Sequence, residues 1–303
     1  MSLSLIHSRA LLGLQAPAVT VEVHLANGLP SFTLVGLADT EVKEARERVR
    51  CAIQNAGLDF PSNKRITVNL APADLPKDSG RFDLPIALGI LAAHGLLDEE
   101  ALALHEFAGE LSLSGELRPV RGALAMGLAL HGAGVRTRLV LPPVSAEEAA
   151  LVPTTEVYRA AHLSDVVTRF AKPGTNNPLP PPTDASGWSR VAAPAPTRSA
   201  IQGPDLSDVK GQAAPRRALE IAAAGRHSLL LVGPPGTGKS MLAQRFAALL
   251  PEMTLDEALE SAAIASVAGR FELTQWMQRP TRSPHHTATS VALVGGGTPP
   301  RPG

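Results

Sequence analysis

The first 170 residues combine two patterns of apolar positions. Runs of alternating or continuous apolar residues predict strands, and they cover 19–25, 31–37, 65–70 and 138–141, with a hairpin over 107–120 that turns at Ser114-Gly115. Stretches with apolar residues three and four apart predict helices, and they cover 40–57, 83–95 and 164–170. Asp83 is predicted to N-cap the second of these helices, with Pro85 in its first turn. The two patterns together predict a compact α/β unit.

The helix predicted over 40–57 has many charges on the face opposite its apolar residues. Basic and acidic residues are interleaved on that face: Lys43, Arg46, Arg48 and Arg50 with Glu41, Glu44 and Glu47. Opposite charges at this spacing are typical of a solvated helix face, which we favour over a binding surface.

Residues 171–200 are crowded with proline and small polar residues, and no periodic pattern continues through them. This composition predicts an extended linker. Trp188 lies within it, and we interpret it as a residue on a domain surface rather than as a docking anchor. The predicted domains are therefore 1–170 and 201–303, joined by 171–200.

After this linker, residues 205–225 have helical spacing and end at a glycine. An apolar run, 229–232, predicts a strand that enters a glycine-rich loop, and 241–250 leave the loop at helical spacing. A further helix is predicted over 255–269, and loop signals dominate from there to residue 303.

The glycine-rich loop fits the phosphate-binding pattern G-x-x-x-x-G-K-[ST], known as the P-loop. Its residues are Gly233, Pro234, Pro235, Gly236, Thr237, Gly238, Lys239 and Ser240. Glycines let successive backbone N–H groups surround phosphate oxygens, and a helix N-terminus adds its positive dipole end. Lys239 is expected to reach the β- and γ-phosphates, and Ser240 to hold Mg²⁺. The predicted cofactors are therefore ATP and Mg²⁺.

Composition excludes several other classes of protein. Basic and acidic residues number 28 each, so net charge neither favours nor excludes a nucleic-acid partner. Cys51 is the only cysteine, which leaves no disulfide and no cysteine-based metal site. The longest uncharged apolar stretch, 84–97, is too short to span a bilayer, and the N-terminus lacks the features of a secretory signal. We therefore expect a cytoplasmic protein without a membrane partner.

Three blocks together resemble one family. They are NLAPADLPKDSGRFDLPIAL (69–88), DLSDVKGQ (205–212) with the P-loop, and RPTRSPHHTATSVALVGGG (279–297). The chain resembles, over its whole length, the ComM/YifB branch of the bacterial magnesium-chelatase-like AAA+ ATPases. The resemblance implies a Lon-protease/ribosomal-S5-like α/β domain followed by the first part of an AAA+ P-loop α/β domain. It also implies a ring, commonly a hexamer, and a DNA motor for branch migration in recombination and natural transformation.

The Lon-like resemblance raises proteolysis as a rival function. Lon-type peptidases use a serine activated by a lysine. In the segment 76–83 the nucleophile's place is taken by Arg81, and 121–130 offer no lysine. Ser79 and Lys77 are neighbours in sequence, but we interpret them as turn residues rather than a dyad. A fold alone does not establish an activity, so we interpret this domain as one for assembly or recognition.

Other residues of the third block are candidates for contact with DNA or a neighbouring subunit: Arg279, Arg282, His285 and His286. A metal site at the histidine pair is less favoured, because no cysteine or acidic residue is close enough in sequence to complete the ligands. Insertion of Mg²⁺ into a porphyrin is disfavoured by the Lon-like domain that the resemblance implies.

Phosphoryl transfer also needs a carboxylate for Mg²⁺ at the end of a second apolar strand, the Walker B element. The only Asp-Glu after Ser240 is Asp256-Glu257, which stands at a predicted helix start. In the resembled family the Walker B strand follows the segment in which this sequence reaches Gly303. From the sequence alone we therefore name no catalytic residue and expect a catalytically incomplete chain, with a binding or assembly module as the alternative function. We also expect residues 1–170 to fold alone and the P-loop part to expose apolar surface.

Overall fold

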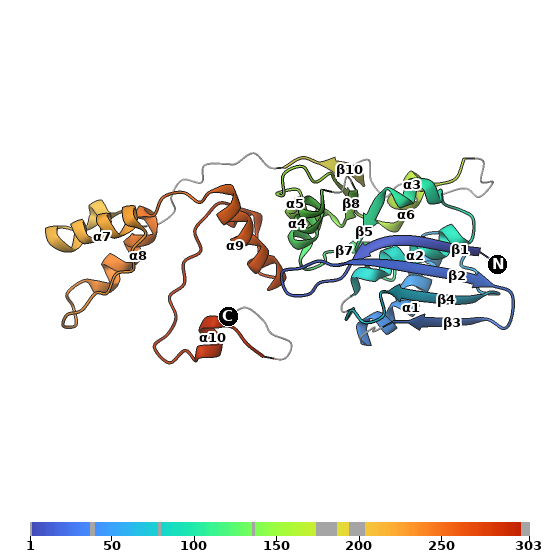
Figure 1. Ribbon diagram of the computed structural model, residues 1–303, viewed down its shortest axis with the longest axis horizontal. Helices are drawn as coiled ribbons and strands as arrows, with labels where there is room; N and C mark the ends of the chain where they lie inside the picture. The colour runs from blue at the N-terminus through green and yellow to red at the C-terminus, as the bar shows by residue number, and fades with distance from the viewer. Residues whose placement is uncertain are drawn as a thin grey trace. The chain divides into compact units, whose positions relative to one another are not determined.

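The computed structural model describes residues 2–36, 40–77, 80–134, 137–173, 187–193 and 204–297. The chain divides into two compact units (Figure 1). The first consists mainly of Met1–Pro194, with Ala263–Phe271, and the second mainly of Ala195–Ala262 and Glu272–Gly296. Each unit is described by itself below.

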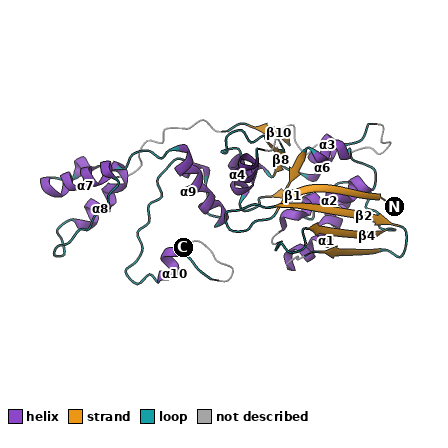
Figure 2. Cartoon of the chain, viewed as in Figure 1, coloured by secondary structure: helices purple, strands orange, loops and turns teal. Residues whose placement is uncertain are grey.

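The first unit contains an eight-stranded mixed sheet and a small hairpin (Figure 2). The strands are β1 (Ser2–Arg9), β2 (Ala18–Ala26), β3 (Ser31–Val35), β4 (Arg65–Ala71), β5 (His105–Phe107), β6 (Glu110–Leu111), β7 (Leu117–Arg118), β8 (Arg138–Leu141), β9 (Val157–Ala160) and β10 (Trp188–Val191). The sheet order is β10-β9-β8-β5-β1-β2-β4-β3, and β6 pairs with β7 as the hairpin. The β1–β2, β2–β4 and β9–β10 pairs are antiparallel, whereas the other pairs of the sheet are parallel.

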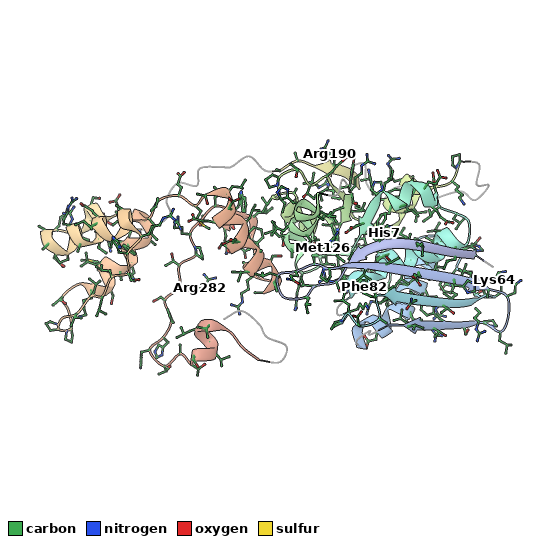
Figure 3. The ribbon with its side chains drawn as sticks, viewed as in Figure 1. His7, Lys64, Phe82, Met126, Arg190 and Arg282 are labelled. Atoms are coloured by element: carbon green, nitrogen blue, oxygen red, sulfur yellow. The ribbon has the colours of Figure 1, made fainter. Side chains whose placement is uncertain are left out.

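Helices complete an α/β fold, as the sequence predicts. They are α1 (Thr40–Asn55), α2 (Asp83–Ala93), α3 (Glu99–Ala103), α4 (Ala123–Ala133), α5 (Pro143–Ala149) and α6 (Leu163–Phe170), with a 3₁₀ turn over Gly80–Phe82. Figure 1 shows α1 and α2 together behind β1, β2, β4 and β3. The main core lies between these helices and the sheet, and Phe82, labelled in Figure 3, is fully buried in it. The predicted strands and the hairpin over 107–120 are confirmed, as are the helices over 40–57, 83–95 and 164–170, each within a few residues.

Helix α2 is buried on all sides, because its eleven residues carry almost no polar group. Gly89 lets it approach the sheet closely, since a Cβ there would lie 2.5 Å from Val23 Cγ2. The Ser4 hydroxyl, on β1, donates a hydrogen bond of 2.7 Å to the Gly89 carbonyl. This contact satisfies two buried polar groups at the tightest point between helix and sheet.

Strand β1 is not among the predicted strands. Its buried face is mixed, since Ser4 and Ser8 are buried together with Ile6, while Leu3 and Leu5 are 57% and 49% exposed. The apolar residues of this strand therefore lie on both faces, and their pattern does not identify the buried one. What keeps β1 in place is its eight-residue ladder with β2.

The Asp83 carboxylate does not cap α2, which corrects the sequence-based expectation. Phe82 occupies the cap position, and no side chain caps the helix. Asp83 instead accepts hydrogen bonds from Arg48 Nε (2.7 Å), Arg48 Nη2 (3.1 Å) and the Leu111 N–H (3.2 Å). Burial raises the pKa of Asp83 to about 6, although the Arg48 guanidinium opposes this rise. Arg48, predicted as part of a solvated face, is only 20% exposed and ties α1 to α2.

Strand β10 lies inside the segment predicted as linker. It pairs with β9 over four residues, and Trp188 stacks on Tyr158 at a centroid distance of 5.2 Å. The Phe170 ring meets Trp188 edge-on at 5.6 Å. Trp188 is therefore an integral part of the sheet edge, whereas 174–186 and 194–200 lie outside the described residues.

The second unit is mostly helical in its described part. It contains α7 (Ala213–Gly225), α8 (Lys239–Leu249), α10 (Ser290–Val294) and the start of α9 (Leu255–Val267), with 3₁₀ turns over Leu206–Asp208 and Leu273–Gln275. A small core joins α7 and α8, and its buried residues are Leu206, Val209, Leu219 and Leu242. The helices predicted over 205–225, 241–250 and 255–269 are confirmed in their main parts.

The strand predicted over 229–232 is wrong for the structure described. These residues form no ladder, and Leu230 and Val232 are 85% and 84% exposed. A central P-loop strand needs parallel neighbours on both sides, and the described residues of this unit offer none. The predicted exposure of apolar surface is confirmed at this segment.

Candidate nucleotide-binding site

The glycine-rich loop joins the exposed segment 229–232 to the N-terminus of α8. Gly236 and Gly238 both have φ of +83°, a conformation in which other residues are strained. A Cβ at Gly238 would also lie 3.0 Å from the Gln212 side-chain nitrogen, whereas Gly236 has open space around it. Glycine is therefore required at 238 for conformation and for space.

Lys239 is the first residue of α8, and its side chain lies back along the loop. Its Nζ donates hydrogen bonds of 2.7 Å to the backbone oxygens of Gly233 and Pro234. Thr237 Oγ1 lies 3.4 Å from the same nitrogen and donates to the Pro234 oxygen at 2.9 Å. The ammonium group is thus held at the loop by neutral acceptors, which an anionic ligand with stronger charge-assisted bonds can replace.

Ser240 follows on α8 with an exposed side chain. The Gln212 amide donates to the Thr237 carbonyl at 3.4 Å, so the residue before α7 contacts the loop. Gln212 itself has φ of +50°. The structure thus places the eight candidate loop residues in one exposed turn at a helix N-terminus, where orphan N–H groups and the helix dipole favour an anion.

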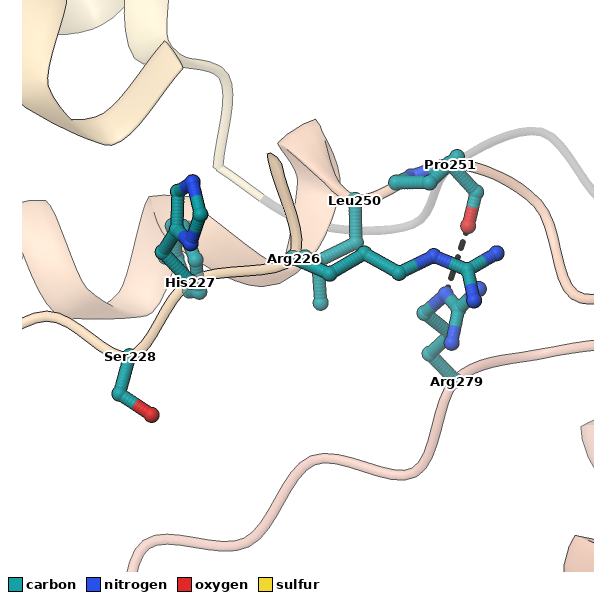
Figure 4. Close-up of a pocket in the computed structure, with 7 residues that line it drawn as sticks. Arg226, His227, Ser228, Leu250, Pro251 and Arg279 are labelled. Atoms are coloured by element: carbon teal, nitrogen blue, oxygen red, sulfur yellow. Dashed lines mark hydrogen bonds between the residues drawn. The ribbon is translucent and has the colours of Figure 1, made fainter. Parts of the chain in front are cut away.

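A pocket of about 320 Å³ lies elsewhere in the second unit (Figure 4). Its lining residues are Arg226, His227, Ser228, Phe246, Leu250, Pro251 and Arg279. Arg279 donates to the Pro251 oxygen at 2.6 Å and to Glu257 at 3.0 Å, and Glu257 also accepts from Arg226 at 3.1 Å. Arg279, a candidate DNA contact, is therefore engaged inside its own unit, and Arg226 is a pocket cation that sequence reasoning missed.

The predicted interpretation of Asp256-Glu257 as a helix start is confirmed. Both lie in the first turn of α9, and the Glu257 carboxylate accepts from the Thr254 N–H at 3.1 Å. Bonds to Thr254 and the two arginines lower the pKa of Glu257. This carboxylate has a structural role at a helix terminus.

The remaining candidates for DNA contact are exposed. Arg282 Nη1 donates to the Thr281 carbonyl at 3.2 Å. The rings of His285 and His286 lie 4.1 Å apart, and His285 Nδ1 is 2.7 Å from Thr287 Oγ1. In the part of the chain that the structure describes, no three His, Cys, Asp or Glu side chains gather as metal ligands would. Contact with DNA stays a prediction for these residues.

Comparison with known proteins identifies the family to which this chain belongs. Residues 21–144 match the family described as subunit ChlI of Mg-chelatase, and 205–303 match the family described as magnesium chelatase, subunit ChlI. Competence protein ComM of Haemophilus influenzae is 51% identical over the whole chain, and YifB of Escherichia coli is 48% identical. The chain belongs to the magnesium-chelatase-like family that includes ComM and YifB. It spans 58% and 57% of the length of these two relatives.

A more distant similarity is to Lon proteases. A Lon protease of Roseiflexus castenholzii is 27% identical over 181 residues, which cover 55% of this chain and 22% of that protein. At the segment resembling the Lon nucleophile, Arg81 is buried and donates to the Arg121 carbonyl at 3.0 Å. Lys77 is buried, donates to the Pro72 carbonyl, and has its pKa lowered by burial. Ser79 lies outside the described residues.

Among the described residues, no helix combines the length and the apolar character needed to cross a bilayer.

Proposed function

We propose that residues 233–240 bind the phosphates of ATP with Mg²⁺, and that the chain is the nucleotide-binding part of an AAA+ ATPase. The observation that carries the proposal is the Lys239 ammonium group at the α8 N-terminus, held only by exposed loop oxygens. ATP supplies the phosphoryl group whose transfer releases free energy in such ATPases.

The residues of the loop 233–240 fit the phosphate groups of ATP. Gly236 and Gly238 leave the loop without side chains where phosphate oxygens approach. The Lys239 ammonium group lies at the loop oxygens of Gly233 and Pro234, and the exposed Ser240 follows it on α8. Lys239 would neutralise phosphate charge, and Ser240 would orient the metal.

For the whole protein, we propose a ring-forming motor that acts on DNA in recombination and natural transformation. Its support is the 51% identity to competence protein ComM in an alignment that covers the whole of this chain. AAA+ modules of the family that this chain resembles commonly work as hexameric rings, so a hexamer is the proposed assembly. A second proposal concerns the domains: residues 1–170 and 201–303 belong to separate domains joined by 171–200, with β10 of that segment added to the sheet of the first.

Nucleotide binding by the full chain tests the proposal. A fluorescent ATP analogue is titrated with and without Mg²⁺ into the wild type and Lys239→Ala. We expect Lys239→Ala to weaken binding by at least about tenfold, because charge-assisted bonds are lost. Lys210→Ala is the matched control, since Lys210 is an exposed lysine of the same unit with one long bond to Ser207. Equal affinity of wild type and Lys239→Ala would overturn the proposal.

Ser240→Ala separates the metal from the phosphates. It is expected to keep the affinity measured without Mg²⁺ and to lose the gain that Mg²⁺ gives. A gain that survives unchanged would exclude Ser240 as a metal ligand.

A further inference from the structure

A second pocket lies in the first unit, where strands β3 and β4 begin. It has a volume of about 150 Å³ between α1, the start of β3 and the loop that leads into β4. Its lining residues are Pro30, Ser31, Phe32, Arg46, Arg50, Phe60, Pro61, Ser62, Lys64 and Ile66. Figure 3 labels Lys64 at this end of the sheet. Since β3 is the last strand in the sheet order, the pocket lies at a sheet edge.

The charged side chains that line this pocket are all positive. Three cations line it and no carboxylate does. Arg46 and Arg50 are one helical turn apart on α1, so they share a face. Glu47, outside the lining, accepts from Arg46 at 3.4 Å and from Arg50 at 2.8 Å. Lys64 donates to the neutral Asn27 side chain at 2.7 Å. Three cations and one carboxylate leave an excess of two positive charges.

The apolar part of the pocket includes two aromatic rings beside Pro30, Pro61 and Ile66. Phe32 and Phe60 are partly buried against the main core, so their positions are fixed by packing. Ser31 and Ser62 add hydroxyl groups to the lining. Flat apolar rings beside guanidinium and ammonium groups match a ligand that joins a flat ring to an anionic phosphate. Stacking on aromatic side chains with cations along the backbone is how single strands are bound.

We propose that this pocket binds single-stranded nucleic acid, with an unpaired base against Phe32 and Phe60. The adjacent phosphates contact Arg46, Arg50 and Lys64. A duplex does not fit this chemistry, because stacking between neighbouring base pairs hides the base faces. The inference deepens the proposed function, because it assigns the strand contact to the first unit, away from the nucleotide loop.

The test is binding of a fluorescent oligothymidylate of about 12 nucleotides to the full chain, followed by anisotropy without ATP. Phe60→Leu keeps apolar volume but loses the ring, and we expect about tenfold weaker binding. Arg46→Ala with Arg50→Ala removes two phosphate contacts. Between about 50 and about 200 mM salt, the slope of log K against log salt should therefore fall by about 1.4.

Matched controls separate the pocket from general charge and from folding. Arg118→Ala with Arg190→Ala removes the same charge from two exposed arginines of the first unit, and it should leave the anisotropy titration within about twofold. Lys239→Ala should bind the oligonucleotide like wild type while it loses ATP. Thermal unfolding checks that each variant is folded.

An abasic oligomer of the same length tests the base contact, and an oligouridylate tests whether RNA is bound equally. Weaker binding of the abasic oligomer supports the proposal. The ratio of the affinities for the oligothymidylate and the oligouridylate shows whether the pocket prefers DNA or RNA. The proposal is overturned if Phe60→Leu and the arginine pair both bind like wild type. It is also overturned if an acidic peptide displaces the fluorescent oligonucleotide as well as an unlabelled oligonucleotide does, because the pocket would then recognise negative charge alone.

Discussion

Two apolar segments of this molecule differ sharply in their exposure to solvent. In β4, Ile66, Val68 and Leu70 are at most 2% exposed, because β2 and β3 hold the strand in the sheet and this face packs into the main core. In the second unit, Leu230 and Val232 are more than four-fifths exposed. The difference lies in neighbours rather than in side chains, because a β-strand is stable only when its backbone groups have partners.

The cores of the two units differ in the same way. The first has a continuous cluster from β1 to α6, tied by an ion pair between α1 and α2. The second has a much smaller cluster, in which Leu206, Val209, Leu219 and Leu242 are buried between α7, α8 and the turn before them. Substitutions in the first unit should therefore cost far more stability than comparable substitutions in the second.

The largest effect is expected for Arg48→Ala. The change leaves the fully buried Asp83 carboxylate without its cation, and removing one partner of a buried pair costs about 3–5 kcal/mol. Urea unfolding followed by Trp188 fluorescence measures it, in a Trp276→Phe background so that one tryptophan reports. Arg46→Ala, on the same helix and 57% exposed, should change stability by less than about 0.5 kcal/mol. Similar losses in the two variants would contradict the role assigned to Arg48.

A matched pair of leucines tests the comparison directly. Leu70→Ala removes a fully buried side chain and should destabilise the first unit by about 2–5 kcal/mol. Leu230→Ala removes an 85% exposed side chain, so it should leave stability within about 0.5 kcal/mol. Differential scanning calorimetry of the two variants checks this. A large loss for Leu230→Ala would show that the segment is buried in solution.

A smaller effect is expected in the pH dependence of the first unit. Burial raises the folded-state pKa of Asp83 from 3.8 to about 6, so the folded protein holds this proton more tightly than the unfolded chain. The resulting contribution to stability is fully present below about pH 4 and is lost as the pH rises through about 6. The stability of wild type relative to Asp83→Asn should therefore fall over this interval. A difference that is constant between these pH values would contradict the raised pKa.

Much of the fold is predictable from particular patterns. The strand over 65–70 follows from apolar spacing, because its burial alternates with the period of a strand. The helix over 83–95 follows from its boundary signals, Pro85 in the first turn and the stop at Gly95, because it is buried on all sides. Strand β1 is not predicted, since the buried Ser4 donates a hydrogen bond to the Gly89 carbonyl that no local pattern shows. Strand β10 is not predicted, because its four residues lie between proline-rich stretches. Its stability comes from pairing with β9 and from stacking of Trp188 on Tyr158.

The candidate sites show the same limit. The nucleotide loop is found from sequence alone, because glycine, lysine and serine must stand at fixed spacing for their chemistry. The pocket at β3 is not found, since Arg50 and Phe60 are brought together only by the turn between α1 and β4. The alternating charges on the predicted helix over 40–57 concealed that two of its arginines line a pocket.

Hydrogen exchange of the full chain, with and without saturating ATP and Mg²⁺, tests the central claim most directly. Amides of 233–240 should gain protection in wild type and not in Lys239→Ala, since backbone N–H groups of the loop would bind phosphate oxygens. Loop amides that exchange at the same rate with and without nucleotide would contradict it.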